Sequence, residues 1–557
     1  MLRNRSVPAR AIYMASTVTN ASVLVAPPKS ASALDQKLAK PKSPIGRWGT
    51  AAFTLVVVGS LSYIAAKLAS DLSVVHSTSV FAYVLLGIAL LLALGFEFVN
   101  GFHDTANAVA TVIYTHSLEP RVAVIWSGIW NFIGVLTSSG AVAFTIVALL
   151  PHELTLKVSR GSGFSMIFAL LIAAMLWNLV TWFRGLPVSS SHTMIGSVLG
   201  VGIAYQLVNG HSALSGVNMP EVIKVFKALL FSPLIGFAGA VLLYFLFKSL
   251  LRDPRLFKAP EGTQPPPFSI RLLMILTCTG VSFAHGQNDG QKGMGLIMLI
   301  LIGTVPTAYA LNHAIDKGSV QPFAVTSTQV AGSLQHYALP NITVAQSEPV
   351  LEQFLATHKY DSQTIPALQE MITTISNEAV SYGSLGNVPP EMQANVRNQM
   401  YLVSETLSLL PKTGPKMAPA DLKIIASYKS FLDRSTKYIP TWVKVAVALA
   451  LGLGTMVGWK RIVVTVGEKI GKTHMTYAQG AVAGLTAMGT ILAAGMYGLP
   501  VSTTHVLNSG VAGTMVANGS GIQRSTIRNI ILAWFFTLPA AALLSGLLFV
   551  LFNKIAS

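Results

Sequence analysis

The chain has 557 residues, of which 52% are hydrophobic and only 11% charged, and its mean hydropathy is +0.58. This composition excludes an ordinary soluble domain and predicts a polytopic membrane protein. The single cysteine, Cys278, excludes an intramolecular disulfide and a cysteine metal cluster. The net charge of +17 gathers in the N-terminal tail and in short loops, so it indicates membrane topology rather than nucleic-acid binding.

The N-terminal residues 1–47 are predicted to form a disordered basic tail. They contain eight Lys or Arg against one acid, Asp35, and no apolar run long enough to span a membrane. An Arg-rich, Ser-rich and acid-poor segment is also typical of a transit peptide, which is the alternative interpretation. Residues 48–80 then add an extra transmembrane helix, at Ala51–Ala69, and a loop.

Transmembrane helices need about 20 mostly apolar residues. Twelve segments are candidates, some of them short enough to be halves of broken spans. They are Ala51–Ala69, Phe81–Phe98, Val122–Leu150, Phe164–Phe183, Thr193–Val208, Val222–Leu251, Ile270–Phe283, Met294–Leu311, Trp442–Gly458, Tyr477–Met496, Val506–Ala517 and Ile527–Phe552.

Two polar motifs occur twice among these segments. The sequence GFHDTAN at Gly101–Asn107 aligns with GQNDGQK at Gly286–Lys292, which brings Asp104 and Asp289 into register. A second pair agrees, because GLPVSSSH ends at His192 and GLPVSTTH ends at His505. The chain is therefore predicted to be a duplication.

The spacing of the motifs locates an insertion. Asp104 and His192 are 88 positions apart whereas Asp289 and His505 are 216 apart, and the excess of 128 matches the long polar stretch 312–440. Patterns at Ala367–Ser376 and Met392–Ser408 predict amphipathic helices inside it. The predicted division is therefore a first repeat at 81–251, a basic Pro-rich linker at 252–270, and a second repeat at 271–311 and 441–557, with 312–440 as an insert.

An ionisable side chain at membrane depth is costly, so it is kept where it faces a protein interior, a cavity or a ligand. Asp104 and Asp289 are therefore predicted to be functional. The small residues around them favour helices broken in mid-membrane, whose exposed N–H groups attract an anion, although close helix packing explains glycine equally well.

The GLPVS loops place a proline before a run of hydroxyl groups. Because proline excludes the preceding residue from helical geometry, Leu186 and Leu499 should end a helix and the following residues should cap the next one. Capping alone explains hydroxyl groups at such positions, namely Ser189, Ser190, Ser502 and Thr503. Their near-identical occurrence in both halves favours a symmetric anion clamp.

The carboxylates can discriminate between anions. Phosphate near neutral pH carries O–H donors and sulfate has none, so a buried carboxylate that accepts such a proton selects phosphate. Alternatively, Asp104 and Asp289 neutralise a co-transported cation. Glu97 is a third intramembrane acid, which would bind a cation or proton or pair with a buried lysine.

In combination, the doubled G-x-[HN]-D-x-x-[NK] motif and the doubled GLPVS-[ST]-[ST]-H loop resemble the inorganic phosphate transporter (Pit) family, and within it the bacterial low-affinity phosphate permeases. The resemblance covers roughly 81–552, without much of the insert. It implies an all-α polytopic membrane protein of two inverted-topology repeats with discontinuous helices and about 10–12 transmembrane segments. It also implies a transporter rather than an enzyme, with phosphate bound between the halves and no cofactor.

The predicted site residues fall into two groups. The substrate-binding residues are Asp104, Asn107, Ser189, Ser190, Ser191, Asn288, Asp289, Lys292, Ser502, Thr503 and Thr504. The residues for the coupling ion are Glu97, His103, Asp104, His192, Asp289 and His505. No structural metal site is predicted.

This sequence departs from the family's usual asparagine-aspartate pair at His103, and it has Lys292 where the first half has Asn107. Four of the twelve histidines, His103, His192, His285 and His505, lie in the repeated motifs. Because histidine titrates near the working pH, these departures favour coupling to protons over sodium, with a metal-phosphate complex as a further option. Alternatively, the histidines cap helices, Lys292 pairs with Asp289, and coupling is set elsewhere.

The expected partners are inorganic phosphate, a divalent cation that travels with it, protons or sodium, the lipid bilayer, and a second copy in a homodimer, with no nucleic acid. The expected location is a bacterial inner membrane, or an organelle inner membrane if the tail is a transit peptide. The alternatives are a sodium-coupled phosphate or sulfate permease and, from another class, a membrane channel or a membrane enzyme.

Overall fold

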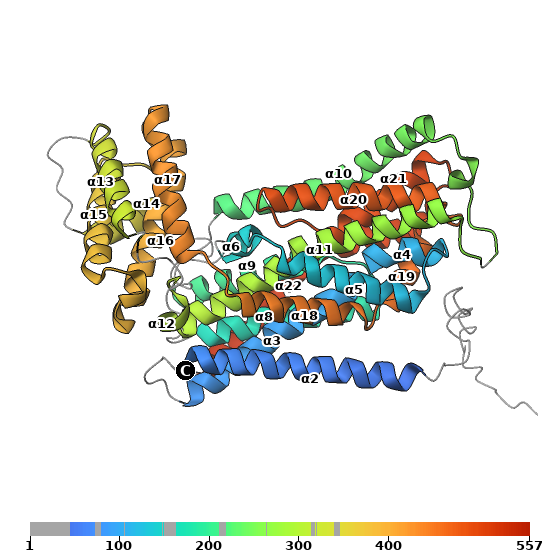
Figure 1. Ribbon diagram of the computed structural model, residues 1–557, viewed down its shortest axis with the longest axis horizontal. Coiled ribbons are helices and arrows are strands. Elements are labelled where there is room, and N and C mark those ends of the chain that lie inside the picture. Colours follow the sequence, from blue (N-terminus) through green and yellow to red (C-terminus); the bar gives the residue numbers. More distant parts are fainter. Residues whose placement is uncertain are drawn as a thin grey trace, which may run out of the picture. The chain divides into compact units, whose positions relative to one another are not determined.

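The computed structural model describes residues 45–72, 80–104, 106–147, 149, 163–210, 219–262, 264–312, 318, 320–338 and 346–556. The chain divides into two units, residues 1–46 and 47–557, and the description below concerns the second. Residues 1–44, which hold nearly all of the predicted tail and its transit-peptide alternative, lie outside the described residues. Apart from an isolated bridge between Gly471 and Ile522, the described chain is built of helices and loops (Figure 1).

In the described residues, the first predicted repeat and the helix before it supply eight helices. They are α2 (Ile45–Leu72), α3 (Val80–Asp104), α4 (Ala106–Tyr114), α5 (Pro120–Leu136), α6 (Ala141–Val147), α8 (Gly163–Phe183), α9 (Ser190–Val208) and α10 (Met219–Leu250). The predicted segment Val122–Leu150 is thus two helices, α5 and α6, with a bend of 75° between them. The first acidic motif lies where α3 ends and α4 begins.

The second predicted repeat follows a short 3-10 turn, η1 (Pro254–Phe257). Its helices are α11 (Phe268–Thr304), α12 (Pro306–Tyr309), α18 (Thr441–Thr455), α19 (Lys460–Val464), the π-helical turn η4 (Thr465–Lys469), α20 (Tyr477–Met496), α21 (Thr503–Ala517) and α22 (Arg524–Ala556).

The prediction of a helix broken at the second acidic motif was wrong. The segments Ile270–Phe283 and Met294–Leu311 belong mainly to one continuous helix, α11, which passes through Asp289 without a break. The glycines of this motif permit close packing instead, since a Cβ at Gly290 would lie 2.4 Å from Val135 Cγ2. Close helix packing was the alternative interpretation of these glycines, and it is confirmed for α11.

The two halves interlock through equivalent contacts. Helix α11 packs along α5, and its counterpart α3 packs along α18; likewise α9 packs along α22, and α21 along α10. The crossings match residue by residue. A Cβ at Gly286 would lie 2.2 Å from the Asn131 carbonyl oxygen, and one at Gly101 would lie 2.3 Å from the Leu451 carbonyl oxygen. Each half therefore completes the packing of the other, as a duplication leads one to expect.

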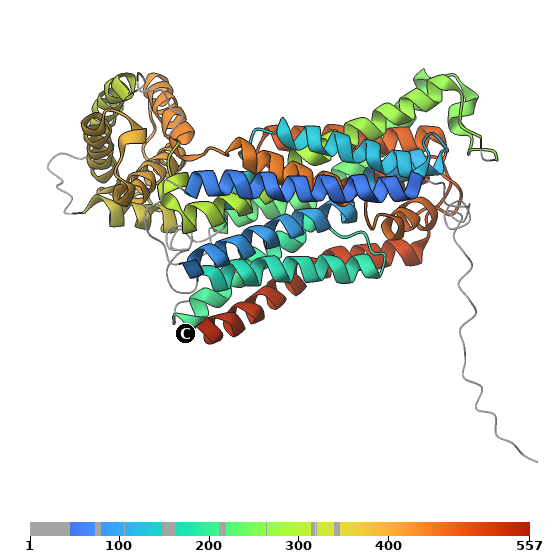
Figure 2. The same ribbon diagram turned by 60° about the horizontal axis from the view of Figure 1, so that its bottom comes forward.

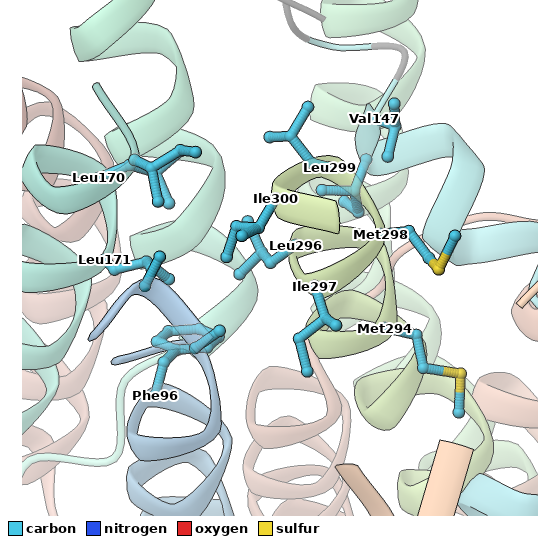
Figure 3. Packing of buried hydrophobic residues seen from close by; sticks show 14 of the residues in the cluster. Phe96, Val147, Leu170, Leu171, Met294, Leu296, Ile297, Met298, Leu299 and Ile300 are labelled. Atoms are coloured by element: carbon cyan, nitrogen blue, oxygen red, sulfur yellow. The ribbon is translucent and has the colours of Figure 1, made fainter. Parts of the chain in front are cut away.

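The apolar core surrounds the second half of α11. Figure 3 shows Leu296 and Ile300 pointing toward Leu170 and Leu171 of α8, with Phe96 of α3 nearby, and all five side chains are buried. This packing explains why the glycine-rich motif continues as a helix, because breaking α11 would leave these apolar side chains without partners.

Seven helices of the described chain are long and apolar enough to cross a membrane, or up to nine if each bent helix pair is one span. Large apolar side chains are exposed on the outer helices, including Leu55 of α2, Leu242 of α10 and Phe535 of α22. Such a surface suits contact with lipid. Because lipid offers no hydrogen-bond partners to the backbone, a spanning segment must satisfy its own N–H and C=O groups, as a helix does. The protein is therefore an integral membrane protein, and α9 and α21 are not among the counted spans.

The predicted insert forms a bundle with its own core (Figure 2). Its elements are α13 (Val320–Gln335), α14 (Ser347–Thr357), α15 (Thr364–Tyr382), η3 (Leu385–Asn387), α16 (Pro390–Thr413) and α17 (Pro419–Thr436). The two predicted amphipathic helices are confirmed within α15 and α16. The core contains Ile372 and Met400, and Phe323 stacks on Tyr428 at 5.2 Å between ring centroids.

The ends of the insert are held by the extra helix α2. The Asp71 carboxylate accepts hydrogen bonds from Tyr309 Oη at 2.8 Å and from Trp442 Nε1 at 3.0 Å. These two residues precede and follow the insert in the sequence. One side chain of α2 therefore joins both places where the chain passes between the transport repeat and the bundle.

The glycine crossing gives a first testable prediction. Gly286→Ala should lower the free energy of unfolding by about 1–3 kcal/mol, because the new methyl group would overlap the Asn131 backbone. Gly489→Ala is the matched control, since a Cβ there meets nothing within 4 Å and alanine favours the helix. The thermal midpoints of the purified variants measure the effect, and an unchanged midpoint for Gly286→Ala would contradict the assigned crossing.

The insert is predicted to be dispensable for transport because it lies outside the duplicated unit. Its ends are close together, since the Asn312 backbone N–H donates to the Ser435 carbonyl at 2.9 Å. A short Gly/Ser linker replacing Val320–Thr436 should therefore preserve uptake per molecule at the membrane. Complete loss of uptake in a well-folded variant would show that the bundle is part of the transport machinery.

Candidate functional site

The two GLPVS loops end helices and begin others, as predicted. Helix α8 ends at Phe183 and α20 ends at Met496, and the loops then lead into α9 and α21. The Ser189 hydroxyl accepts a hydrogen bond from the His192 backbone N–H at 3.2 Å, and the Ser502 hydroxyl accepts one from the His505 N–H at 3.1 Å. These two serines are therefore the N-caps.

The hydroxyl groups that follow the caps meet the first carboxylate. Ser190 Oγ donates to Asp104 Oδ2 at 2.9 Å, and Thr504 Oγ1 donates to Asp104 Oδ1. The first contact lies within one repeat and the second comes from the other repeat. His103 Nδ1 lies 3.6 Å from Asp104 Oδ1, and all four residues are buried.

The second carboxylate has a fixed cation. Lys292 Nζ lies 2.7 Å from Asp289 Oδ1 and also donates to Ser191 Oγ. Thr503 Oγ1 donates to Asp289 Oδ2 at 3.4 Å, in the position that Ser190 takes at Asp104. The pairing of Lys292 with Asp289, one of the two alternatives from the sequence, is therefore present. A buried ion pair of this kind needs further hydrogen bonds to be stable, and Ser191 and Thr503 provide them.

A histidine outside the predicted residue set lies between the two carboxylates. His285 Nε2 is 3.8 Å from Asp104 Oδ2 and 3.4 Å from Asp289 Oδ2, and its Nδ1 is 2.8 Å from Asn131 Oδ1. The signal was present in the sequence, because residues four apart on a helix share a face and His285 precedes Asp289 by four. The spacing indicates a shared face only if His285 and Asp289 belong to one continuous helix, and the sequence had predicted a break there.

Asp104, His285 and Asp289 each offer a ligand atom, and these atoms lie within 4.8 Å of one another. Two carboxylate oxygens and an imidazole nitrogen suit either a proton or a divalent cation of borderline softness. The geometry of the cluster would therefore suit a positive charge held between Asp104 and Asp289.

Asn288 has a positioning role. Its Nδ2 donates to the Leu499 carbonyl at 3.1 Å, and its Oδ1 accepts from the Val501 N–H at 3.4 Å, which fixes the second GLPVS loop. Its counterpart His103 places Nε2 3.5 Å from Thr181 Oγ1 of α8. Asn107 is the second residue of α4, but its side chain lies outside the described part of the structure.

The remaining predicted coupling residues lie around the carboxylates. The rings of His192 and His505 are 4.6 Å apart, and His505 stacks on Trp534 at 3.9 Å. Glu97 is fully buried and accepts a hydrogen bond from Asn100 Nδ2 at 3.3 Å. A partner lysine for Glu97, the alternative from the sequence, does not occur within ion-pair distance in the described chain.

The site thus combines two helix N-termini, four hydroxyl-bearing side chains, two carboxylates and a lysine, all enclosed between two repeats of apolar spans. Helix N-termini and hydroxyl donors bind oxyanions, whereas carboxylates accept protons or bind cations. A buried site of this composition among apolar spans is what a membrane transport protein needs to bind a polar substrate.

Comparison with known proteins identifies the family. The model of the phosphate transporter family matches residues 100–545, and the chain belongs to this family, which makes it a transporter rather than an enzyme. It is 41% identical over 486 residues to the low-affinity inorganic phosphate transporter PitB of Escherichia coli K12, covering 83% of this chain and 96% of the relative. It is 29% identical over 467 residues to a probable low-affinity inorganic phosphate transporter of Bacillus subtilis, covering 84% and 96%.

Among solved structures, a sodium-dependent phosphate transporter is similar at 20% sequence identity with a TM-score of 0.48. The match covers 85% of this chain and all of that one.

The buried ion pair gives a stability prediction. Asp289→Asn leaves Lys292 charged and without its carboxylate, which should cost about 3–5 kcal/mol and lower the thermal midpoint. Adding Lys292→Met should restore much of that loss without restoring uptake. Lys224→Met is the control, because its pair with Glu221 is half-exposed and should contribute little. A double variant no more stable than Asp289→Asn alone would disprove the pairing.

Proposed function

We propose that this chain is a symporter of inorganic phosphate, coupled to protons, that binds its substrate between two inverted repeats in a bacterial inner membrane. The observation that carries the proposal is the meeting of both GLPVS helices, α9 and α21, at one carboxylate, that of Asp104. Ser190 and Thr504 reach Asp104 from different repeats, so any movement of one repeat against the other changes the lining of the site.

The lining suits a partly protonated phosphate. The hydroxyls that now donate to Asp104 and Asp289 can turn to donate to phosphate oxygens, and the freed carboxylate oxygens then accept the phosphate O–H groups. Sulfate has no such proton, so it would leave a buried carboxylate unsatisfied, which carries a large desolvation cost. The Ser189 and Ser502 hydroxyls already cap helices, so they would act on the substrate by holding the N-termini of α9 and α21 in place.

The relatives support phosphate as the substrate. Those named above are described as inorganic phosphate transporters, and the matches cover 96% of their length. They are bacterial proteins, which is the support for an inner-membrane location.

The contacts of three side chains, Lys292, His285 and His103, favour protons over sodium as the coupling ion. Lys292 already supplies Asp289 with a cation at 2.7 Å, which opposes the binding of a sodium ion at that carboxylate. His285 lies between both carboxylates, where a proton on its ring would interact with each of them. His103 lies next to Asp104 in the same way.

A second candidate is the transport of phosphate together with a divalent cation. The cluster of Asp104, His285 and Asp289 favours it, because these three groups can ligate an ion to which phosphate then binds. Magnesium or zinc should then stimulate uptake at constant free phosphate, and a chelator should reduce it; no effect of either would remove this candidate.

The substrate is tested by uptake of radiolabelled phosphate in a transporter-deficient cell. Uptake should exceed the background severalfold, excess sulfate should not compete, and Asp104→Asn should abolish uptake without reducing the amount of protein at the membrane. Efficient competition by sulfate would overturn the carboxylate as the basis of selection, and near-normal uptake by Asp104→Asn would remove Asp104 from the site.

The coupling ion is tested in the same cells. Uptake should persist without sodium, collapse with a protonophore, and lose its pH response in His103→Gln and His285→Gln. His336→Gln is the control, because this histidine lies exposed in the insert. Strict sodium dependence with a flat response between about pH 5.5 and 8, the range around the histidine pKa, would disprove proton coupling while leaving the substrate unaffected.

A further inference from the structure

Helix α16 of the insert carries a row of polar side chains on the face away from the bundle core. Arg397, Tyr401 and Glu405 follow one another at four-residue spacing, so they lie on one side of the helix. Between them, Val396 and Met400 pack into the core of the bundle. Helix α12, where the chain leaves the transport repeat, contacts α16.

The two carboxylates near this row already have cations. Lys437 Nζ lies 2.6 Å from Glu405 Oε1 and 3.0 Å from Asp433 Oδ1, and Lys429 also pairs with Asp433. Burial opposes the charge on Lys437, but Glu405 and Asp433 outweigh it and raise the pKa of this lysine. A third carboxylate, Glu221, also acts on Tyr401 and pairs with Lys224 at 2.9 Å, so each of these carboxylates has a lysine partner.

Arg397 adds a further buried cation. It is only 4% exposed, and its Nε has no hydrogen-bond partner in the described chain. Its Nη1 makes a long contact of 3.4 Å to Oδ1 of the adjacent Asn398, and its guanidinium lies over the Tyr401 ring at 5.0 Å from the ring centroid. None of the described carboxylates lies within ion-pair distance, and burial lowers the pKa of Arg397.

A guanidinium has five donors in a planar fork that matches two oxygens of a phosphate group, and stacking on a tyrosine satisfies none of them. A buried charge without a counter-ion destabilises a fold strongly. One turn earlier on the same face, Gln393 is also buried and its Oε1 has no partner. The face therefore offers a buried guanidinium whose Nε has no partner, followed by an unsatisfied acceptor, Gln393 Oε1.

We propose that Arg397 and Gln393 form a binding site for a phosphate-type oxyanion, separate from the transport site. Arg397 binds two oxygens of the phosphate group, and Gln393 Oε1 accepts a hydrogen bond from a hydroxyl of the ligand. Two sources supply this chemistry. One is free inorganic phosphate, and the other is the headgroup of an anionic lipid such as phosphatidylglycerol, which carries both a phosphate and hydroxyl groups.

The test compares the thermal midpoints of the full-length wild type and of Arg397→Met under three conditions. In neutral lipid and an anion-free buffer, Arg397→Met should be the more stable, because it removes an uncompensated buried charge. Inorganic phosphate, or phosphatidylglycerol in the vesicles, should reverse this order by raising the wild type by about 2 °C or more relative to the variant. The transport site is present in both proteins and cancels in the comparison.

Each outcome decides the matter. Reversal by inorganic phosphate identifies free phosphate as the ligand, and reversal only with phosphatidylglycerol identifies a lipid headgroup. An Arg397→Met variant that is less stable by the same amount in every condition would overturn the site, since Arg397 would then act through packing on Tyr401 alone. Lys437→Met is the matched control. Lys437 already pairs with Glu405 and Asp433, so the change in thermal midpoint that this substitution causes should be the same with and without the ligand.

If Arg397→Met fails to fold, a second variant, Arg397→Lys, still tests the proposed site. Arg397→Lys keeps the charge but loses the planar fork, so the ligand should raise its thermal midpoint by less than half of the wild-type shift. An equal shift in both proteins would overturn bidentate binding at this position. Failure of the site would leave phosphate uptake unchanged, so the transport function and the proposed site are tested independently.

Discussion

The need to neutralise two carboxylates buried between membrane-spanning helices governs this structure. Asp104 and Asp289 lie where water is excluded, and each unsatisfied oxygen there would cost several kcal/mol. The first turns of α9 and α21 provide the hydrogen bonds, because they carry hydroxyl groups directly after the N-cap residues. That requirement fixes the two loops, and the close helix crossings at Gly101 and Gly286 in turn hold α3 and α11 in place.

Much of this arrangement could be predicted from sequence because it is local or repeated. The proline before the hydroxyls predicts a helix end and a cap, and Ser189 and Ser502 are those caps. Alignment of the repeats predicts that Asp104 and Asp289 occupy equivalent places, and equivalent donors meet them. The insert was located by counting residues, because a duplicated unit keeps its internal spacing unless something is added.

The remainder depends on tertiary packing, which one sequence does not reveal. Glycines predict both a broken helix and a close crossing, and only the partner helix decides between them; for α11 the partner α5 made it a crossing. The same uncertainty hid His285, whose position between the carboxylates follows from an unbroken α11. Thr504 gives a second example, because its hydrogen bond to Asp104 joins residues 400 positions apart and depends on how the two repeats pack together.

The departures from symmetry bear directly on mechanism. Equivalent carboxylates in equivalent surroundings would titrate alike and give a cycle no preferred order of binding. Here the aspartates have neighbours of different chemistry: Lys292, a fixed cation, binds Asp289, whereas the titratable ring of His103 lies beside Asp104. His285 connects the two, at 3.8 Å from one and 3.4 Å from the other. A charge added at His103 would therefore lie beside Asp104, whereas a charge at His285 would lie beside both carboxylates and Asp289 already has Lys292 as its cation. The repeated backbone supplies two matching helix N-termini, and the unmatched side chains give the two carboxylates different neighbours.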